Sequence, residues 1–111
     1  MSFRLQKVNQ LIKKELSRII LRQADFPEKV LVTLTRVDAS PDLKQAKVYV
    51  SVIPEEKSRQ VMEHLSQSIY PIQQKLNQRL KMRVIPKIRF VKEEKTAEAG
   101  RVEEILEKIR Q

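Results

Sequence analysis

Residues 31–53 read LVTLTRVDASPDLKQAKVYVSVI, two runs rich in β-branched residues on either side of a turn-forming segment, 38–43. These runs predict a β-hairpin. Side chains alternate across a strand, so one face of the hairpin is apolar. That face carries Val32, Leu34, Ala46, Val48, Val50 and Val52. The other face carries Thr33, Thr35, Lys47, Tyr49 and Ser51. Burying the apolar face requires a cover, which the amphipathic segments on both sides can supply.

The segment before the hairpin is predicted to be a helix from Ser2, a suitable N-cap, to about Arg22. Apolar residues recur in steps of three and four at Leu5, Val8, Ile12, Leu16 and Ile19. At ~100° per residue, a group of basic residues falls within about 80° of arc, away from this stripe. The group consists of Arg4, Lys7, Lys14, Arg18 and Arg22. It is either a solvated face or a binding surface. A membrane-surface helix is less favoured, because the apolar stripe is needed on the sheet.

The segment after the hairpin is predicted to be a second, interrupted helix. Pro54 followed by two glutamates is typical of a helix start. An apolar stripe then runs as far as Met82, through Val61, Leu65, Ile69, Ile72, Leu76 and Leu80. Pro71 lies inside this pattern, where it removes one hydrogen bond and disfavours the helical conformation of the preceding residue. We therefore expect a helix, a kink at Ser68, Ile69, Tyr70 and Pro71, and another helix.

A third strand is predicted within Val84–Val91, where Ile88 and Phe90 face inward and Lys87 and Arg89 face outward. Pro86 marks its start or an edge of the sheet. A last helix is expected from about Ala97 to Arg110. Its short apolar stripe consists of Val102, Ile105, Leu106 and Ile109.

The length and the charge of the chain limit the number of domains and the kind of binding partner to be expected. A chain of 111 residues with 41% apolar content supports one compact core. Residues 1–92 hold 19 basic and 8 acidic side chains, net +11, whereas residues 93–111 hold 4 and 6, net −2. We expect a basic RNA-binding domain over residues 1–92 and a tail over 93–111. A polyanion is the partner that such a charge favours.

Several kinds of site are not expected. The chain has no cysteine and only one glycine, which excludes thiolate chemistry and a glycine-rich phosphate loop. His64 is the only histidine, so we interpret it as an ordinary helix residue. We expect no metal, no cofactor and no enzyme activity. No run approaches the ~20 apolar residues of a membrane span, and the start lacks a signal-peptide pattern. The expectation is a cytoplasmic monomer without a membrane partner.

The order helix, strand, strand, kinked helix, strand resembles a KH-like fold of the second type: α+β, a three-stranded sheet, and helices packed on one face. The residues themselves resemble the ribosome-binding factor A family over about residues 3–106. In the first helix the matching residues are Arg4, Lys7, Val8, Leu11 and Ile12. In the hairpin they are Val37, Ser40, Asp42, Leu43, Ala46, Val48, Tyr49, Val50 and Ser51. Farther on they are Leu76, Leu80, Met82, Arg83, Pro86 and Phe90.

The chain departs from this family's pattern at two places. The family's Ala-x-Gly kink corresponds here to Ser68-Ile69-Tyr70, and the proline that follows offers another way to impose the kink. The family's Asp-x-Ser stretch after the last strand reads Glu93-Glu94-Lys95. The resemblance implies an assembly factor that binds the immature 30S subunit and 16S rRNA. It also implies a role in late maturation and rRNA processing, notably in the cold.

The leading hypothesis is therefore RNA binding during ribosome assembly, with phosphates giving affinity and ribosome shape giving specificity. The expected phosphate contacts are Arg4, Lys7, Lys14, Arg18, Lys75, Arg79, Lys81, Arg83, Lys87 and Arg89. With two tyrosines and no tryptophan, base stacking is expected to be a minor contribution. The alternatives are a general RNA- or DNA-binding protein with no tie to ribosome assembly, and a protein-interaction module with a solvated basic face.

Overall fold

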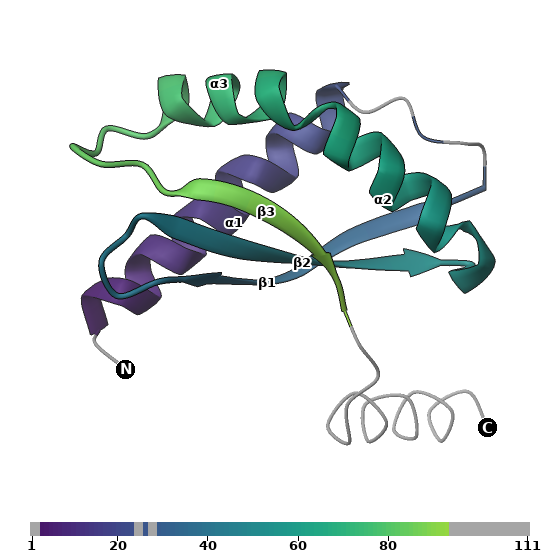
Figure 1. The fold of residues 1–111 in the computed structure, drawn as a ribbon, viewed down its shortest axis with the longest axis horizontal. Coiled ribbons are helices and arrows are strands. Elements are labelled where there is room, and N and C mark those ends of the chain that lie inside the picture. The colour runs from purple at the N-terminus through teal and green to yellow at the C-terminus, as the bar shows by residue number, and fades with distance from the viewer. Residues whose placement is uncertain (1–2, 24–25, 27–28, 94–111) are drawn as a thin grey trace.

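The structure is a computed structural model and describes residues 3–23, 26 and 29–93 (Figure 1). In chain order the elements are α1 (Phe3–Gln23), β1 (Leu31–Ala39), β2 (Gln45–Ile53), a short 3-10 helix η1 (Glu55–Lys57), α2 (Ser58–Gln67), α3 (Ile69–Arg79) and β3 (Lys87–Lys92). This is the α+β, KH-like order expected from the sequence. The N-cap expected at Ser2 and the helix expected at 97–110 lie outside the described residues.

The three strands form one sheet in the order β1-β2-β3. β1 and β2 pair antiparallel, and the turn between them closes when the Ser40 N–H donates to the Gln45 carbonyl at 2.8 Å. β2 and β3 pair parallel. A parallel pair needs a crossover that returns the chain to the same end of the sheet. Here α2 and α3 provide that crossover (Figure 1).

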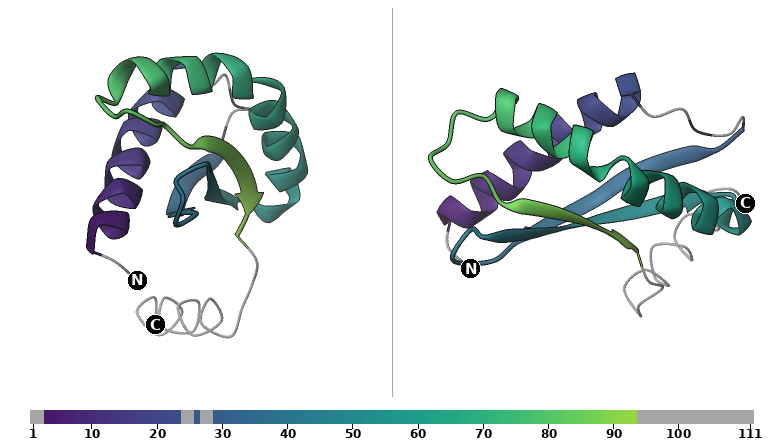
Figure 2. Two further views of the ribbon diagram at one scale, coloured as in Figure 1. Left: turned by 60° about the vertical axis from the view of Figure 1, so that its left-hand side comes forward. Right: turned by 45° about the horizontal axis from the view of Figure 1, so that its top comes forward.

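All three helices lie on one face of the sheet, and the other face carries no described element (Figure 2). Between the helices and the sheet lies the core, where apolar side chains of every helix and strand are buried. Large, fully buried side chains of this core include Ile12, Leu16, Ile19, Val48, Val50, Val61, Leu65 and Leu76. The apolar stripe predicted for α1 is therefore the stripe that packs on the sheet. This one-sided cover leaves the polar face of the hairpin exposed.

A β-bulge interrupts the alternation of β1. The register pairs Leu34 with Val50 and Arg36 with Tyr49, so Thr35 has no partner of its own. The buried positions of β1 are accordingly Leu34, Val37 and Ala39, with a step of three after Leu34. A bulge leaves one extra residue in one strand and shifts the phase of its side chains.

Several boundaries differ from those expected. The turn was expected to begin at Asp38, but β1 continues to Ala39, with Asp38 paired to Lys47 and Ala39 to Ala46. α3 ends at Arg79 instead of Met82, because Leu80 is extended (φ −91°, ψ 127°) although its side chain remains buried. β3 begins at Lys87, directly after the Pro86 that was expected to mark its start or an edge, and it continues past Val91 to Lys92. Pro86 has no N–H, so the first bond is donated by Lys87 N to the Lys44 carbonyl at 3.1 Å. The chain after Pro54 first forms η1, and α2 starts only at Ser58.

Candidate nucleic-acid interface

The junction of α1 and α3 brings basic residues from two helices together. Glu15 of α1 is mostly buried, with a side chain 14% exposed. Its Oε2 accepts a hydrogen bond from Arg79 Nη1 of α3 at 3.3 Å, and its Oε1 lies 3.8 Å from Arg18 Nη1. One carboxylate thus holds two guanidinium groups side by side, although they are 61 residues apart in the chain. Both arginine side chains remain partly exposed, and ion pairs in contact with water contribute little stability, so positioning is the main effect of this cluster.

Two exposed lysines extend this cluster along the same helices. Lys14 lies four residues before Arg18 on α1, and Lys75 lies four residues before Arg79 on α3. Residues four apart are neighbours on a helix surface. We call the set Lys14, Arg18, Lys75 and Arg79 the helix-layer surface. Buried leucines on each helix, Leu16 and Leu76, pack into the common core, so both helices are anchored beneath these cations.

The remaining predicted contacts lie elsewhere, so the ten residues do not form one patch. Lys87 and Arg89 are exposed and alternate along β3 with the buried Ile88 and Phe90, so they lie on the face of the sheet opposite the helices. Lys81 and Arg83 lie in the connection between α3 and β3. Gln73 anchors the end of that connection: its Nε2 donates to the Pro86 carbonyl at 3.1 Å, and its Oε1 accepts from the Ile88 N–H at 2.9 Å.

The N-terminal part of α1 has a different environment. Lys7 Nζ lies 4.8 Å from the centroid of the exposed Phe3 ring. Arg4 lines a cleft of about 620 Å³ between α1 and the hairpin turn. The other lining residues are Leu5, Val8, Asp38, Ala39, Pro41, Asp42 and Leu43. Two carboxylates beside a single guanidinium make this cleft a poor site for phosphate.

The turn carboxylate Asp42 is held as an anion. Ser40 Oγ donates to Asp42 Oδ1 at 2.6 Å, and the Lys44 N–H donates to the same oxygen at 3.1 Å. These hydrogen bonds, the one from Ser40 first, lower the pKa of Asp42 below its ordinary 3.8. The result is a well-ordered turn at the end of the hairpin.

The break between α2 and α3 falls at Ser68, whose backbone is non-helical (φ −96°, ψ 8°). The Ser68 N–H donates to the His64 carbonyl at 3.0 Å, and the Ile72 N–H donates to the Ser68 carbonyl at 3.2 Å. Pro71 is the third residue of α3, where an N–H has no partner within the helix. In one continuous helix, that position would have to donate to the Gln67 carbonyl. Tyr70 is 72% exposed beside the break.

Sequence reasoning missed one pair of aromatic and basic residues. Arg36 of β1 lies over the Tyr49 ring of β2, with 3.8 Å between the guanidinium carbon and the ring centroid. The signal was present: apolar residues at 32, 34, 37 and 39 reveal a change of phase in the strand. His64, by contrast, is half-buried and contacts the Phe26 ring edge-on, at 5.6 Å between centroids.

Two further observations concern the described ranges 3–23, 26 and 29–93 only. Within them, no three His, Cys, Asp or Glu side chains gather as a metal site. None of the helices in these ranges combines the length and apolarity that crossing a membrane requires.

The sequence pattern of the family described as ribosome-binding factor A matches residues 4–106. A ribosome-binding factor A of Halothermothrix orenii is 35% identical over 109 residues, which cover 97% of this chain and 89% of the relative. The crystal structure of ribosome-binding factor A from Thermus thermophilus superimposes with a TM-score of 0.69 at 25% identity, covering 79% of this chain and 93% of that one.

A third comparison involves a homology model of the Thermus thermophilus factor, fitted into a cryo-electron microscopy map of its complex with the 30S subunit. It matches with a TM-score of 0.61 at 27% identity and covers 75% of this chain and 88% of that one. Sequence and fold thus agree over most of the chain, and the protein belongs to the ribosome-binding factor A family.

Proposed function

We propose that this protein is an assembly factor that binds the immature 30S subunit as a monomer, contacts 16S rRNA and assists late maturation. Family membership supports the ribosome as the partner. The Thermus thermophilus relative fitted into a map of a 30S complex supports the small subunit in particular. Residues 1–92 are proposed as the RNA-binding domain.

The clustering of basic side chains on the helix-layer surface is the main structural support for this proposal. Arg18 and Arg79 lie beside the single Glu15 carboxylate. Lys14 and Lys75 add two exposed positive charges on the same helices, so the surface keeps a net positive charge. Arg18 and Arg79 are fixed by that carboxylate, which lowers the entropy lost when they bind phosphates. Guanidinium groups suit phosphate because they donate two hydrogen bonds at once. This surface supplies the affinity, and the shape of the subunit supplies the specificity.

The test is sedimentation of the full chain through a sucrose gradient in a lysate. We expect the protein with free 30S particles and nearly none with 70S ribosomes or polysomes. Lys14→Glu combined with Lys75→Glu should move the protein from the 30S peak to the top of the gradient. Lys57→Glu combined with Arg59→Glu is the matched control, with the same change of charge at exposed positions of η1 and α2.

Other distributions would contradict the proposal. Equal occupancy of 30S particles and translating ribosomes would indicate a ribosomal or hibernation protein. Diffuse association with RNA or DNA would favour a general nucleic-acid-binding protein, and no association would favour a protein-interaction module. Equal effects of the α1–α3 pair and the control pair would show that total charge matters and the helix-layer surface does not.

A further inference from the structure

The face of the sheet without helices is organised in rows by the strand register. Lys47 of β2 lies opposite Asp38 of β1 and Arg89 of β3. In the next row along, Tyr49 lies opposite Arg36 and Val91. Lys87 precedes Arg89 by two residues and therefore points to the same side. We call the set Arg36, Lys47, Tyr49, Lys87 and Arg89 the open sheet face.

Arg36 belongs to this face because of the bulge in β1. Strict alternation from the buried Leu34 would turn Arg36 toward the core, where an unpaired charge is costly. The bulge skips Thr35 in the register and sets Arg36 opposite Tyr49 instead. Bulges often serve to re-aim a side chain. Here the outcome is an arginine laid across an aromatic ring on an exposed sheet.

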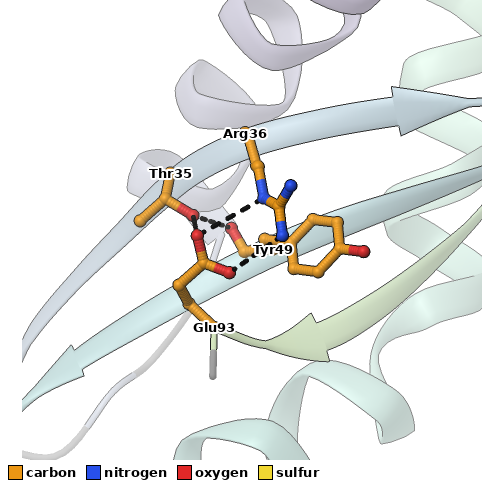
Figure 3. A network of polar contacts seen from close by, with 4 residues as sticks. All are labelled: Thr35, Arg36, Tyr49 and Glu93. Carbon is orange, nitrogen blue, oxygen red and sulfur yellow. Dashed lines mark hydrogen bonds and ion pairs between the residues drawn. The ribbon is translucent and has the colours of Figure 1, made fainter. Parts of the chain in front are cut away.

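Glu93, just after β3, holds that arginine in place (Figure 3). Its Oε1 lies 3.4 Å from Arg36 Nε, and its Oε2 accepts from Arg36 Nη2 at 3.5 Å. Thr35 Oγ1 lies 3.2 Å from Glu93 Oε1 and 3.3 Å from the Tyr49 carbonyl, so its single hydrogen can be donated to either. The Arg36 side chain remains 55% exposed. Its guanidinium is thus fixed between the ring and solvent.

We propose that the open sheet face binds a single-stranded segment of RNA. One unpaired base stacks on the solvent-facing side of the Arg36 guanidinium, and backbone phosphates contact Lys47, Lys87 and Arg89. Single-stranded RNA is commonly bound by stacking its bases on aromatic rings or guanidinium planes. This inference rests on the proposed function, because it takes RNA as the partner. It adds a second contact surface, on the side of the sheet opposite the helix-layer surface.

Both the charge and the planarity of this face favour single-stranded RNA as the partner. Lys47, Lys87 and Arg89 add three positive charges to that of Arg36. Two acidic side chains accompany them, Asp38 opposite Lys47 and Glu93 beside Arg36, so the face keeps a net positive charge. A duplex would hide the faces of its bases within the stack and could use only the cations. A single strand can use the cations and the guanidinium plane together, so it should bind in preference to a duplex of the same sequence.

The experiment uses the full chain and a 12-nucleotide single-stranded RNA carrying one 2-aminopurine, whose fluorescence falls when the base stacks. Arg36→Lys keeps the charge and removes the plane. It should weaken binding at least about fivefold and lose the quenching, while the dependence on salt stays the same. Lys47→Gln combined with Arg89→Gln removes two phosphate contacts and should make the slope of log affinity against log salt shallower by about 1.4. Thermal unfolding of each variant checks its fold.

Lys57→Gln combined with Arg59→Gln is the control and should bind the RNA like the unaltered chain. The inference is overturned if Arg36→Lys retains full affinity and quenching, or if a duplex of the same sequence competes equally well. Equal competition by poly(glutamate) would assign the face to an acidic protein and would also overturn it. If these tests fail while the chain still sediments with 30S particles, only this inference falls. If the unaltered chain does not sediment with 30S particles, the proposed function itself fails.

Discussion

Glu15→Gln is expected to lower stability and to strengthen RNA binding, two effects of opposite sign from one substitution. The Glu15 carboxylate lies 3.3 Å from Arg79 and 3.8 Å from Arg18, so it offsets part of the positive charge of the helix-layer surface. Glutamine has nearly the same shape and can still accept a hydrogen bond from Arg79. The change therefore removes the negative charge and leaves the packing of α1 on α3 in place.

The loss of stability follows from the two ion pairs. At about 0.2–1 kcal/mol for an exposed pair, removing both costs roughly 0.5–2 kcal/mol. For a domain of this size, 1 kcal/mol lowers the melting temperature by about 4–8 °C. Thermal unfolding followed by circular dichroism measures this change in melting temperature. Arg59 and Glu63 form an exposed pair on α2, so Glu63→Gln is a matched control that should change the melting temperature less.

The gain in binding follows from the freed cations. With one more unneutralised positive charge available to phosphate, the slope of log affinity against log salt should steepen by about 0.7–0.9. The affinity for purified 30S particles at low salt should rise accordingly, whereas Glu63→Gln should leave both unchanged. An unchanged salt slope together with a lower melting temperature would refute this prediction. It would show that the Glu15 ion pairs are only structural and that phosphates do not contact Arg18 or Arg79.

Three further outcomes are expected. Pro71→Ala should preserve the break at Ser68, because straightening the helix would expose the buried Ile72 and Leu76. It should lower the free energy of unfolding by only about 0.4–1 kcal/mol, because the unfolded chain gains entropy without the proline. A gain in helical circular dichroism would contradict this. Leu76→Ala should cost about 2–5 kcal/mol in a urea titration, and a cost below about 1 kcal/mol would show that α3 is not anchored in the core. Asp42→Asn should lower the free energy of unfolding above about pH 4, and the stabilities of the variant and the unaltered chain should converge at lower pH. The reason is that a carboxylate whose pKa is lowered on folding stabilises the fold only while it is ionised. Urea titrations from about pH 3 to 6 measure this difference in stability, and a difference independent of pH would contradict the prediction.

The apolar faces of α1 and β2 could be predicted from the sequence, because each follows from a single periodicity. β1 follows its alternation only as far as the bulge after Leu34. The errors arose where one residue overrides the periodicity. Leu80 is buried in the core although its backbone is already extended, so the apolar pattern continues beyond the end of α3. Pro86 cannot donate a hydrogen bond, so pairing of the third strand begins one residue later.

The candidate site was harder to predict than the fold. Basic residues could be listed from the sequence, but their grouping depends on contacts between distant segments. Glu15 joins Arg18 to Arg79 only because α1 and α3 pack together. The open sheet face depends on the bulge after Leu34 and on the hydrogen bond from Arg36 to Glu93, two residues that are 57 positions apart in the sequence. The spacing of apolar residues in β1 indicates the bulge, but neither the Glu15 contacts nor the Glu93 contact leaves a local signature in the sequence.

Directed hydroxyl-radical probing of 16S rRNA tests the central claim most directly, because the chain has no cysteine and a single introduced one gives a unique point of attachment. An iron chelate at Gln78→Cys would stand beside Arg79 on α3, and one at Gln60→Cys would stand on α2; both positions are exposed. In complexes with purified 30S particles, we predict strong, localised cleavage of 16S rRNA from Gln78→Cys and weak cleavage from Gln60→Cys. Stronger cleavage from Gln60→Cys than from Gln78→Cys would contradict the assignment of the helix-layer surface as the contact with the subunit.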